Sequence, residues 1–387
     1  MGELENKLKE ITKDGGAVLV GIASRERLMD APPSANPGYV LPSAQSVISM
    51  AMLIDKKSIR EFLGKSDWFS HGEDRKQMAR SLYLIGDKLT KFLQDKGHEA
   101  VAIEVNNDYR PEEGAVDVTE MTEFYPDFAH RYGAVASGIA RLGWSGNVLN
   151  PEYGALLELG TVLTSAELEP DTLLSENPCD KCKMCTLVCP VEMISKTETK
   201  EVRIAGITDE IAVKKPNTCC WIGCTGYQGL SVNKKWSNWS PYRLDHPLPT
   251  NKGELDKLNI QLQKADPQMD LPENIFANYR EAMFNPDWLA NTVCGNCRLV
   301  CWQKRDDRKE NMRLVTNSGI VALSPTGDHV VADDEIIEID TPYIVKVAML
   351  KKAYKSGQDG SLKIGKGFTP MDKKVLQYVF GSKVLYS

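Results

Sequence analysis

Seven of the ten cysteines stand in two runs whose spacing suits iron better than disulfide bonds. The first run, C-x2-C-x2-C-x3-C followed by proline, and the second, C-x2-C-x3-C, are formed by Cys179, Cys182, Cys185 and Cys189, and by Cys294, Cys297 and Cys301. In two-cluster ferredoxins the fourth cysteine of such a run binds the other cluster. The spacing therefore predicts two [4Fe–4S] clusters with interleaved ligands, whose chemistry is electron transfer.

The crossed arrangement assigns seven of the eight ligands that two cubes require. One cube would be held by Cys179, Cys182, Cys185 and Cys301, and the other by Cys189, Cys294 and Cys297 with one further thiolate. The segment "PNTCCWIGC" offers Cys219, Cys220 and Cys224 for that place, and the sequence does not choose among them. Structural zinc is the alternative, since it also takes four thiolates, but zinc ribbons normally use two separate pairs.

Composition and charge narrow the class of protein. The chain has 387 residues and a net charge of −6, from 47 basic and 53 acidic residues, which disfavours a dedicated nucleic-acid binder. Its longest apolar stretch, "SVISMAMLI", is too short to span a bilayer, and the N-terminus predicts neither a signal peptide nor a twin-arginine leader. Clustered cysteines, with none before residue 179, indicate reduced thiols and hence a cytoplasmic location.

Hydrophobic periodicity predicts a mixed α/β sheet with helices against its faces. Helices are expected over 3–13, 75–97, 132–143 and 305–313, and strands over 16–24, 46–54, 100–105, 154–165, 320–323, 329–332 and 335–339. Residues 231–290, rich in Asn, Pro and Trp, are expected to be an irregular covering lobe. No G-x-G-x-x-G follows a strand and no P-loop is present, so a nucleotide site is not expected.

The segment "ARLGWSGNVLNPEYGALLELGTVLTSAELEPD", residues 140–171, stands just before the first cysteine run. Its L-G-W-x-G element, its N-P-E-Y-G turn and its apolar strand ending in Thr resemble the cobalamin-dependent epoxyqueuosine reductases and reductive dehalogenases, over residues 125–195 and 290–305. The resemblance implies an α/β (α+β) cobalamin-binding domain (1–170), a ferredoxin-like two-[4Fe–4S] domain (171–315, with the lobe 231–290 inserted) and a small C-terminal extension (316–387). It also implies base-off cobalamin as a cofactor.

The same resemblance implies catalytic and corrinoid-binding residues. Asp127 matches the proton donor of epoxyqueuosine reductases, and the aromatic residues around it would raise the pKa of its carboxyl group. Tyr125, assisted by Arg131 or Arg141, is the alternative donor. The corrinoid would be lined by Trp144, Ser145, Gly146, Asn150, Glu152, Tyr153 and Gly154. Asp127 on the surface, and Trp144 and Tyr153 as core residues, are the simpler interpretations.

We therefore expect a cytoplasmic, oxygen-sensitive oxidoreductase that cleaves a carbon–heteroatom bond of an epoxide-type or halide-type small molecule. Electrons from a ferredoxin or flavodoxin would pass through the Cys189 cluster and then the Cys179 cluster to cobalt. A non-catalytic electron-transfer protein and a corrinoid-reducing activator are the alternatives. Cys301 is followed by Trp302 where the families have proline, and no tRNA-binding extension is evident. Eight lysines after residue 350, among them Lys373 and Lys374, suggest a dock for an acidic donor.

Overall fold

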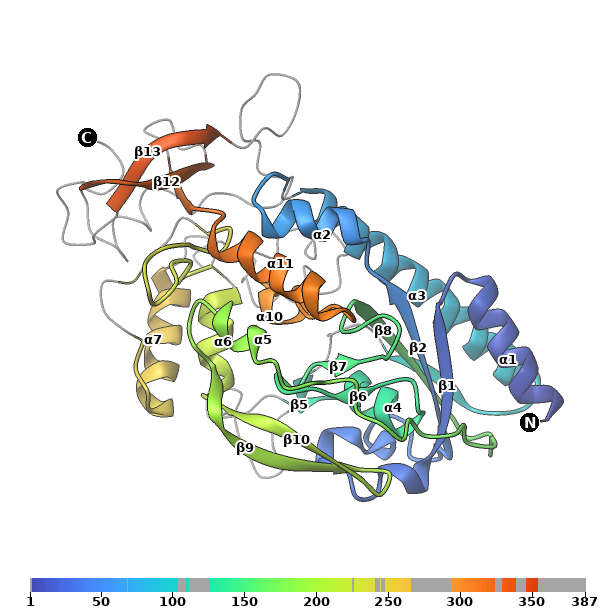
Figure 1. Cartoon of the computed structure of the whole chain (residues 1–387). Coiled ribbons are helices and arrows are strands. Elements are labelled where there is room, and N and C mark those ends of the chain that lie inside the picture. The colour runs from blue at the N-terminus through green and yellow to red at the C-terminus, as the bar shows by residue number, and fades with distance from the viewer. Residues whose placement is uncertain are drawn as a thin grey trace.

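A four-stranded antiparallel sheet forms the centre of the computed structural model (Figure 1). The structure describes residues 2–67, 69–103, 109–110, 125–224, 226–240, 244, 248–265, 294–323, 329–338 and 346–353. The strand order is β1-β2-β8-β3, with β1 at Leu19–Ser24, β2 at Ser46–Leu53, β8 at Leu157–Thr164 and β3 at Ala100–Ile103. Every neighbouring pair in this sheet is antiparallel.

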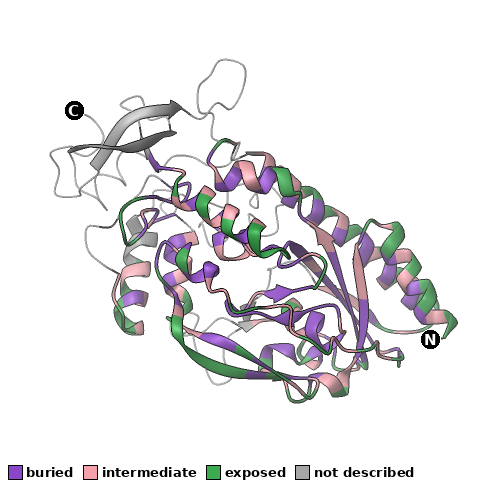
Figure 2. Ribbon diagram, viewed as in Figure 1, coloured by how far each residue is buried: buried purple, intermediate pink, exposed green. Residues whose placement is uncertain are grey.

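Both faces of the sheet are buried, which explains why β2 and β8 are almost continuously apolar. The helices α1 (Glu3–Asp14) and α3 (Phe69–Asp95) cover one face, where Ile48 and Val162 point into the core. The short helix α4 (His130–Ala136) covers the other face, together with Val47 and Leu163. The buried strands lie between these layers in Figure 2.

The cysteine loops form a second packed region beside the sheet. Four helices meet there: α2 (Lys56–Leu63), α5 (Met184–Leu187), α10 (Asn296–Leu299) and α11 (Arg305–Thr316). Trp236, Trp239 and Trp302 are buried among them and join this region to Leu156, at the start of the sheet's third strand. The loops that carry the thiols are therefore held on a rigid base.

The remaining elements surround these two regions. They are the hairpin β9 (Ile194–Ile204)–β10 (Ile207–Lys214), the helices α6 (Asn217–Cys224) and α7 (Lys252–Ala265), the 3-10 helices η1 (Arg25–Leu28), η2 (Pro33–Ala35) and η3 (Pro37–Tyr39), the pairs β4 (Tyr109–Arg110)–β5 (Tyr125–Pro126) and β6 (Arg141–Leu142)–β7 (Val148–Leu149), and the sheet β11 (Ile320–Leu323)–β12 (His329–Glu338)–β13 (Lys346–Ala353). Within the described residues no helix is both long and apolar enough to cross a bilayer.

The predicted mixed α/β class is confirmed, and the antiparallel sheet makes the α+β description the accurate one. Three expectations were wrong. The helix expected over 132–143 ends at Ala136, because Gly138 has a φ of +76° and lies tightly against the Thr172 carbonyl. The lobe 231–290 contains the helix α7, and the strands expected at 329–332 and 335–339 are one strand, β12.

Candidate functional site

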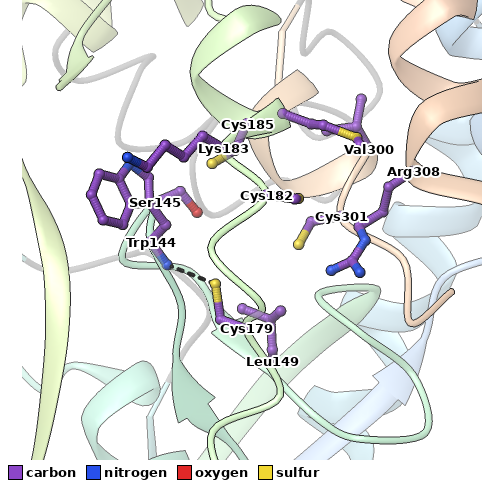
Figure 3. Close-up of a pocket in the computed structure, with 11 residues that line it drawn as sticks. Trp144, Ser145, Leu149, Cys179, Cys182, Lys183, Cys185, Val300, Cys301 and Arg308 are labelled. Atoms are coloured by element: carbon purple, nitrogen blue, oxygen red, sulfur yellow. Dashed lines mark hydrogen bonds between the residues drawn. The ribbon is translucent and has the colours of Figure 1, made fainter. Parts of the chain in front are cut away.

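The thiols gather in two groups. The first thiol group, Cys179, Cys182, Cys185 and Cys301, lines one pocket that Figure 3 shows in close-up. The second thiol group consists of Cys189, Cys220, Cys224, Cys294 and Cys297. Cys301 thus joins the cysteines of the first run, and Cys189 joins those of the second. This exchange between runs is the crossed pattern that the spacing predicts.

The first thiol group sits on a loop with unusual backbone geometry. Lys181 and Lys183 adopt left-handed conformations, with φ of +52° and +60°, which lets the chain curl between successive cysteines. The backbone N–H of Trp144 donates to the Cys179 sulfur at 3.2 Å. Burial raises the pKa of the Cys185 thiol, and its neighbours Cys301, Cys297, Cys179 and Cys182 raise it further. A metal cluster would relieve this repulsion, because iron offsets the charge of the thiolates that bind it.

The second thiol group is tied together by its own sulfurs. The Cys220 and Cys224 sulfurs are 3.6 Å apart, and Cys224 also hydrogen-bonds Cys294. The bond from Cys224 lowers the pKa of Cys294 to about 7. The backbone N–H of Met193 donates to the Cys189 sulfur at 3.3 Å, as a donor to a thiolate would.

Cys219 is directed away from this group. Its thiol donates to the Val191 carbonyl at 3.7 Å, and the residue is fully buried in an apolar cluster. All ten cysteines are free thiols. Within the described residues, no three His, Cys, Asp or Glu side chains are arranged to hold a single metal ion. The donor set instead consists of two clusters of soft thiols, which suits iron–sulfur cubes.

A cation stands beside each thiol group, buried in the first case and half-buried in the second. Arg308 lines the pocket of the first group, and its guanidinium is ion-paired with Asp180 at 2.8 Å. Lys214, at the end of β10, interacts electrostatically with Cys297 and Cys220 of the second group. Burial, followed by the charge of Arg131, lowers the pKa of Lys214 to about 8.

Behind the thiol loops lies a buried ion network centred on Glu158 of β8. Arg298, between Cys297 and Cys301, contacts Glu158 in a short ion pair, and Arg75 of α3 lies 3.7 Å from the same carboxylate oxygen. Burial alone would raise the pKa of Glu158, but the two arginines outweigh it and lower that pKa to about 2. The network fastens the second cysteine run to the sheet.

The predicted catalytic residues lie on the segment that enters α4. Asp127 is half-buried directly after β5, and its neighbour Phe128 is buried in the core. Arg131 is exposed on α4 and donates to the Gly146 carbonyl at 2.8 Å. The Tyr125 side chain and Phe124 lie outside the described residues. Arg141 is not available as a catalytic partner, because it is buried and bound in a bidentate pair with Asp209 of β10.

The predicted corrinoid residues have contacts of their own with the protein. The Trp144 indole N–H donates to the Ser195 carbonyl at 3.0 Å, and Lys183 lies 4.4 Å above its ring. Ser145 accepts from the Asn147 amide within a tight turn. Asn150 donates to the Ile139 carbonyl at 2.9 Å. These contacts account for the burial of Trp144, Ser145 and Asn150 without a ligand, so their role toward a corrinoid stays a prediction.

The turn that follows is built around Gly154. Gly154 has a φ of +61°, and a Cβ there would lie 2.6 Å from the Cys301 carbonyl oxygen. The backbone that approaches it closely is therefore the cysteine loop. Tyr153 is half-buried against the core. At the tip of the turn, Pro151 and Glu152 are exposed to solvent.

Arg308, Lys214 and Glu158 were missed by sequence reasoning. Charged residues are normally exposed, and nothing in the local patterns marks Arg308 and Glu158 as buried or Lys214 as half-buried. The hairpin β9–β10 that carries Lys214 was also missed, although its alternating residues and the two-residue turn Ala205–Gly206 are a recognisable signal.

Comparison with known proteins gives curated relatives of one kind and structural neighbours of two kinds. No family model matches the chain. The epoxyqueuosine reductase of Bacillus cereus is 28% identical over 164 residues, which are 40% of this chain and 37% of that protein. A reductive dehalogenase structure is 14% identical with a TM-score of 0.42, covering 74% of this chain and 38% of that one. An epoxyqueuosine reductase solved with a modified tRNA-Tyr stem loop is 16% identical with a TM-score of 0.38, covering 82% and 81%.

The curated relatives confirm the predicted resemblance to epoxyqueuosine reductases, and by their names these relatives are reductases. The matched segment spans little more than a third of the length of the first of them. The chain thus resembles a superfamily of oxidoreductases, while its own activity, substrate and partners are matters for proposal.

Proposed function

We propose that the protein is an oxidoreductase that carries two [4Fe–4S] clusters and a corrinoid and uses them for a reductive cleavage. The observation that carries this proposal is the exchange of Cys189 and Cys301 between the two thiol groups. Zinc ribbons give no reason for such an exchange, whereas it is the ligand arrangement of two-cluster ferredoxins. When bound, the clusters supply single electrons and the corrinoid supplies a strongly reducing cobalt centre.

The ligands of the first cube would be Cys179, Cys182, Cys185 and Cys301. Those of the second would be Cys189, Cys294 and Cys297, with Cys224 or Cys220 as the fourth. The thiol of Cys219 faces the Val191 carbonyl, which is why we do not assign it as a ligand.

The order of electron flow that we propose reverses the order expected in the sequence analysis. The second thiol group is electrostatically linked to Arg131 through Cys220, and Arg131 follows Asp127 by four residues in the sequence. The first thiol group is linked instead to Asp180 and Arg308, and Asp180 is exposed. An external ferredoxin or flavodoxin would accordingly reduce the first cluster, which passes electrons inward to the second.

The chain's own residues would handle the proton and the substrate. Asp127, three residues before α4 begins, would deliver a proton as the bond breaks, with Tyr125 as the alternative donor. Arg131, held by the Gly146 carbonyl, would orient an anionic or polar group nearby. The residues proposed to surround the corrinoid are those of the loop 144–154.

The substrate is proposed to contain a carbon–heteroatom bond of the epoxide or halide type. The sequence disfavours a nucleic-acid substrate, whereas one protein of similar fold was solved with a tRNA stem loop. Net charge alone does not decide the question, since a local surface and not the whole chain would contact RNA. Substrate tests should therefore include RNA-borne epoxides beside small halides and epoxides.

Cofactor analysis of protein purified without air tests the proposal. We expect about eight iron atoms per chain, four for each cube, and a base-off cobalamin absorption band after addition of cobalamin. Zinc in place of iron would contradict the proposal outright. Full iron content without any cobalamin binding would instead favour the electron-transfer protein.

A further inference from the structure

Arg308 is buried, which is unusual for an arginine. It lies on α11, and its side chain is only 6% exposed. Burying a guanidinium is costly unless its donors are satisfied. One part of it is paired, since Nη2 donates to the Asp180 carboxylate at 2.8 Å. Its Nε is buried and finds no hydrogen-bond partner.

The unpaired part of Arg308 belongs to the pocket of the first thiol group. Arg308 lines that pocket together with Cys182 and Cys301. Figure 3 shows its guanidinium beside the Cys301 thiol, at the margin of the space that the four cysteines enclose. Burial raises the pKa of Cys182 and of Cys301, and Arg308 acts on both thiols in the opposite direction. A positive charge with a free donor thus adjoins four thiols.

Asp180 holds the guanidinium in this position. It stands between Cys179 and Cys182, and its carboxylate also accepts from the backbone N–H of Cys182 at 3.2 Å. One carboxylate therefore links the cysteine loop to α11. The pair differs from an exposed surface ion pair, because the arginine side chain is buried while the Asp180 side chain is about one-third exposed.

We propose that Arg308 is a positioning and tuning residue for the first cluster, which it stabilises in the reduced state. The inference rests on the proposed function, since it requires iron at the first thiol group. Reduction adds negative charge to the cluster, and a buried cation with a free N–H favours the more negative state. Arg308 therefore raises the midpoint potential of the first cluster and leaves that of the second unchanged.

The test is a redox titration of the iron-loaded protein, followed by electron paramagnetic resonance. In Arg308→Met we expect one of the two reduction waves to move to lower potential by at least about 59 mV. This shift corresponds to a tenfold change in the equilibrium constant of a one-electron reduction. Arg308→Lys keeps the charge and should move the same wave less, in the same direction. Arg313→Met removes an exposed arginine from the same helix and should move neither wave.

The outcomes separate this inference from the proposed function. Wild-type protein that binds no iron would refute the proposed function before Arg308 is tested. Normal iron content with unmoved waves in Arg308→Met would overturn the role of Arg308 alone. If Arg308→Met fails to load iron, Arg308→Lys decides: a lowered wave supports the proposal and an unchanged one overturns it.

Discussion

The two thiol groups differ in what surrounds them. A backbone N–H donates to a sulfur in each group, but the first group encloses a pocket and faces a guanidinium that is paired with Asp180. The second group is held by bonds among its own sulfurs, beside a lysine whose pKa burial lowers to about 8. The arginine keeps its positive charge at all ordinary pH values, whereas the lysine can lose its charge as the pH rises. If the two proposed clusters form, the comparison predicts that they differ in potential and that the first is the more strongly tuned.

The largest effect should come from the ligands that distinguish the groups. Cys301→Ser is expected to remove the first cluster and about half of the iron, while Cys189→Ser removes the second. Iron and sulfide analysis with paramagnetic resonance would identify which signal is lost. Cys219→Ser is the matched control, because its thiol faces the Val191 carbonyl and should not affect iron content. Loss of the same signal in both ligand variants would refute the division into two groups.

The next effect concerns the ion network behind the loops. Glu158→Ala leaves Arg75 and Arg298 without their buried carboxylate and should cost about 3–5 kcal/mol of unfolding free energy. Chemical denaturation of the wild type and the variant measures the difference. An equal midpoint for both proteins would show that the network does not support the fold.

The same carboxylate predicts a pH dependence. Its pKa falls from an ordinary 4.5 to about 2 in the folded protein. A depressed carboxyl pKa stabilises the fold above pH 4.5, and that contribution is lost as the pH falls from 4.5 toward 2. Glu158→Gln should show a flatter loss of stability over this acid range. Parallel curves for the two proteins would argue against the role of Glu158.

A smaller effect should distinguish two glycines of positive φ. Gly154→Ala places a methyl group against the Cys301 carbonyl, and it should destabilise the protein by about 1–3 kcal/mol of overpacking beyond the backbone cost. Gly206→Ala meets nothing within 4 Å and should cost only the backbone term, about 1–2 kcal/mol. Thermal unfolding with iron analysis would compare them. Equal losses would mean that Gly154 does not constrain the cysteine loop.

The smallest effect sharpens the contrast between the cations. Lys214→Gln should lower the potential of the second cluster by less than a tenfold change in the one-electron equilibrium, under about 59 mV. The first wave should stay in place, which is the reverse of the expectation for Arg308→Met. Movement of both waves in both variants would show that the clusters form one electrostatic unit.

Much of this arrangement could be predicted from the sequence. The apolar runs predicted β2 and β8. Spacing also predicted which run the thiols of Cys189 and Cys301 would join, and they lie in those groups, while their role as cluster ligands stays a prediction. The burial of Arg308 and Glu158 could not be predicted, because it depends on contacts more than 100 residues apart in the chain. The choice against Cys219 depended equally on a tertiary contact. The proposed dock at Lys373 and Lys374 lies outside the described residues.

The contact between Gly154 and the Cys301 loop has a consequence for assembly. The Ala155 N–H donates to the Cys301 carbonyl at 2.8 Å, so the last cysteine is held against the turn that leads into β8. A cube held by Cys185 and Cys301 would then act as a cross-link that closes a loop of more than 100 residues. Such a closure stabilises by about 4–5 kcal/mol in the chain-entropy description. Iron would then stabilise this region as well as carry electrons. We expect metal-loaded protein to unfold at a clearly higher temperature than metal-free protein.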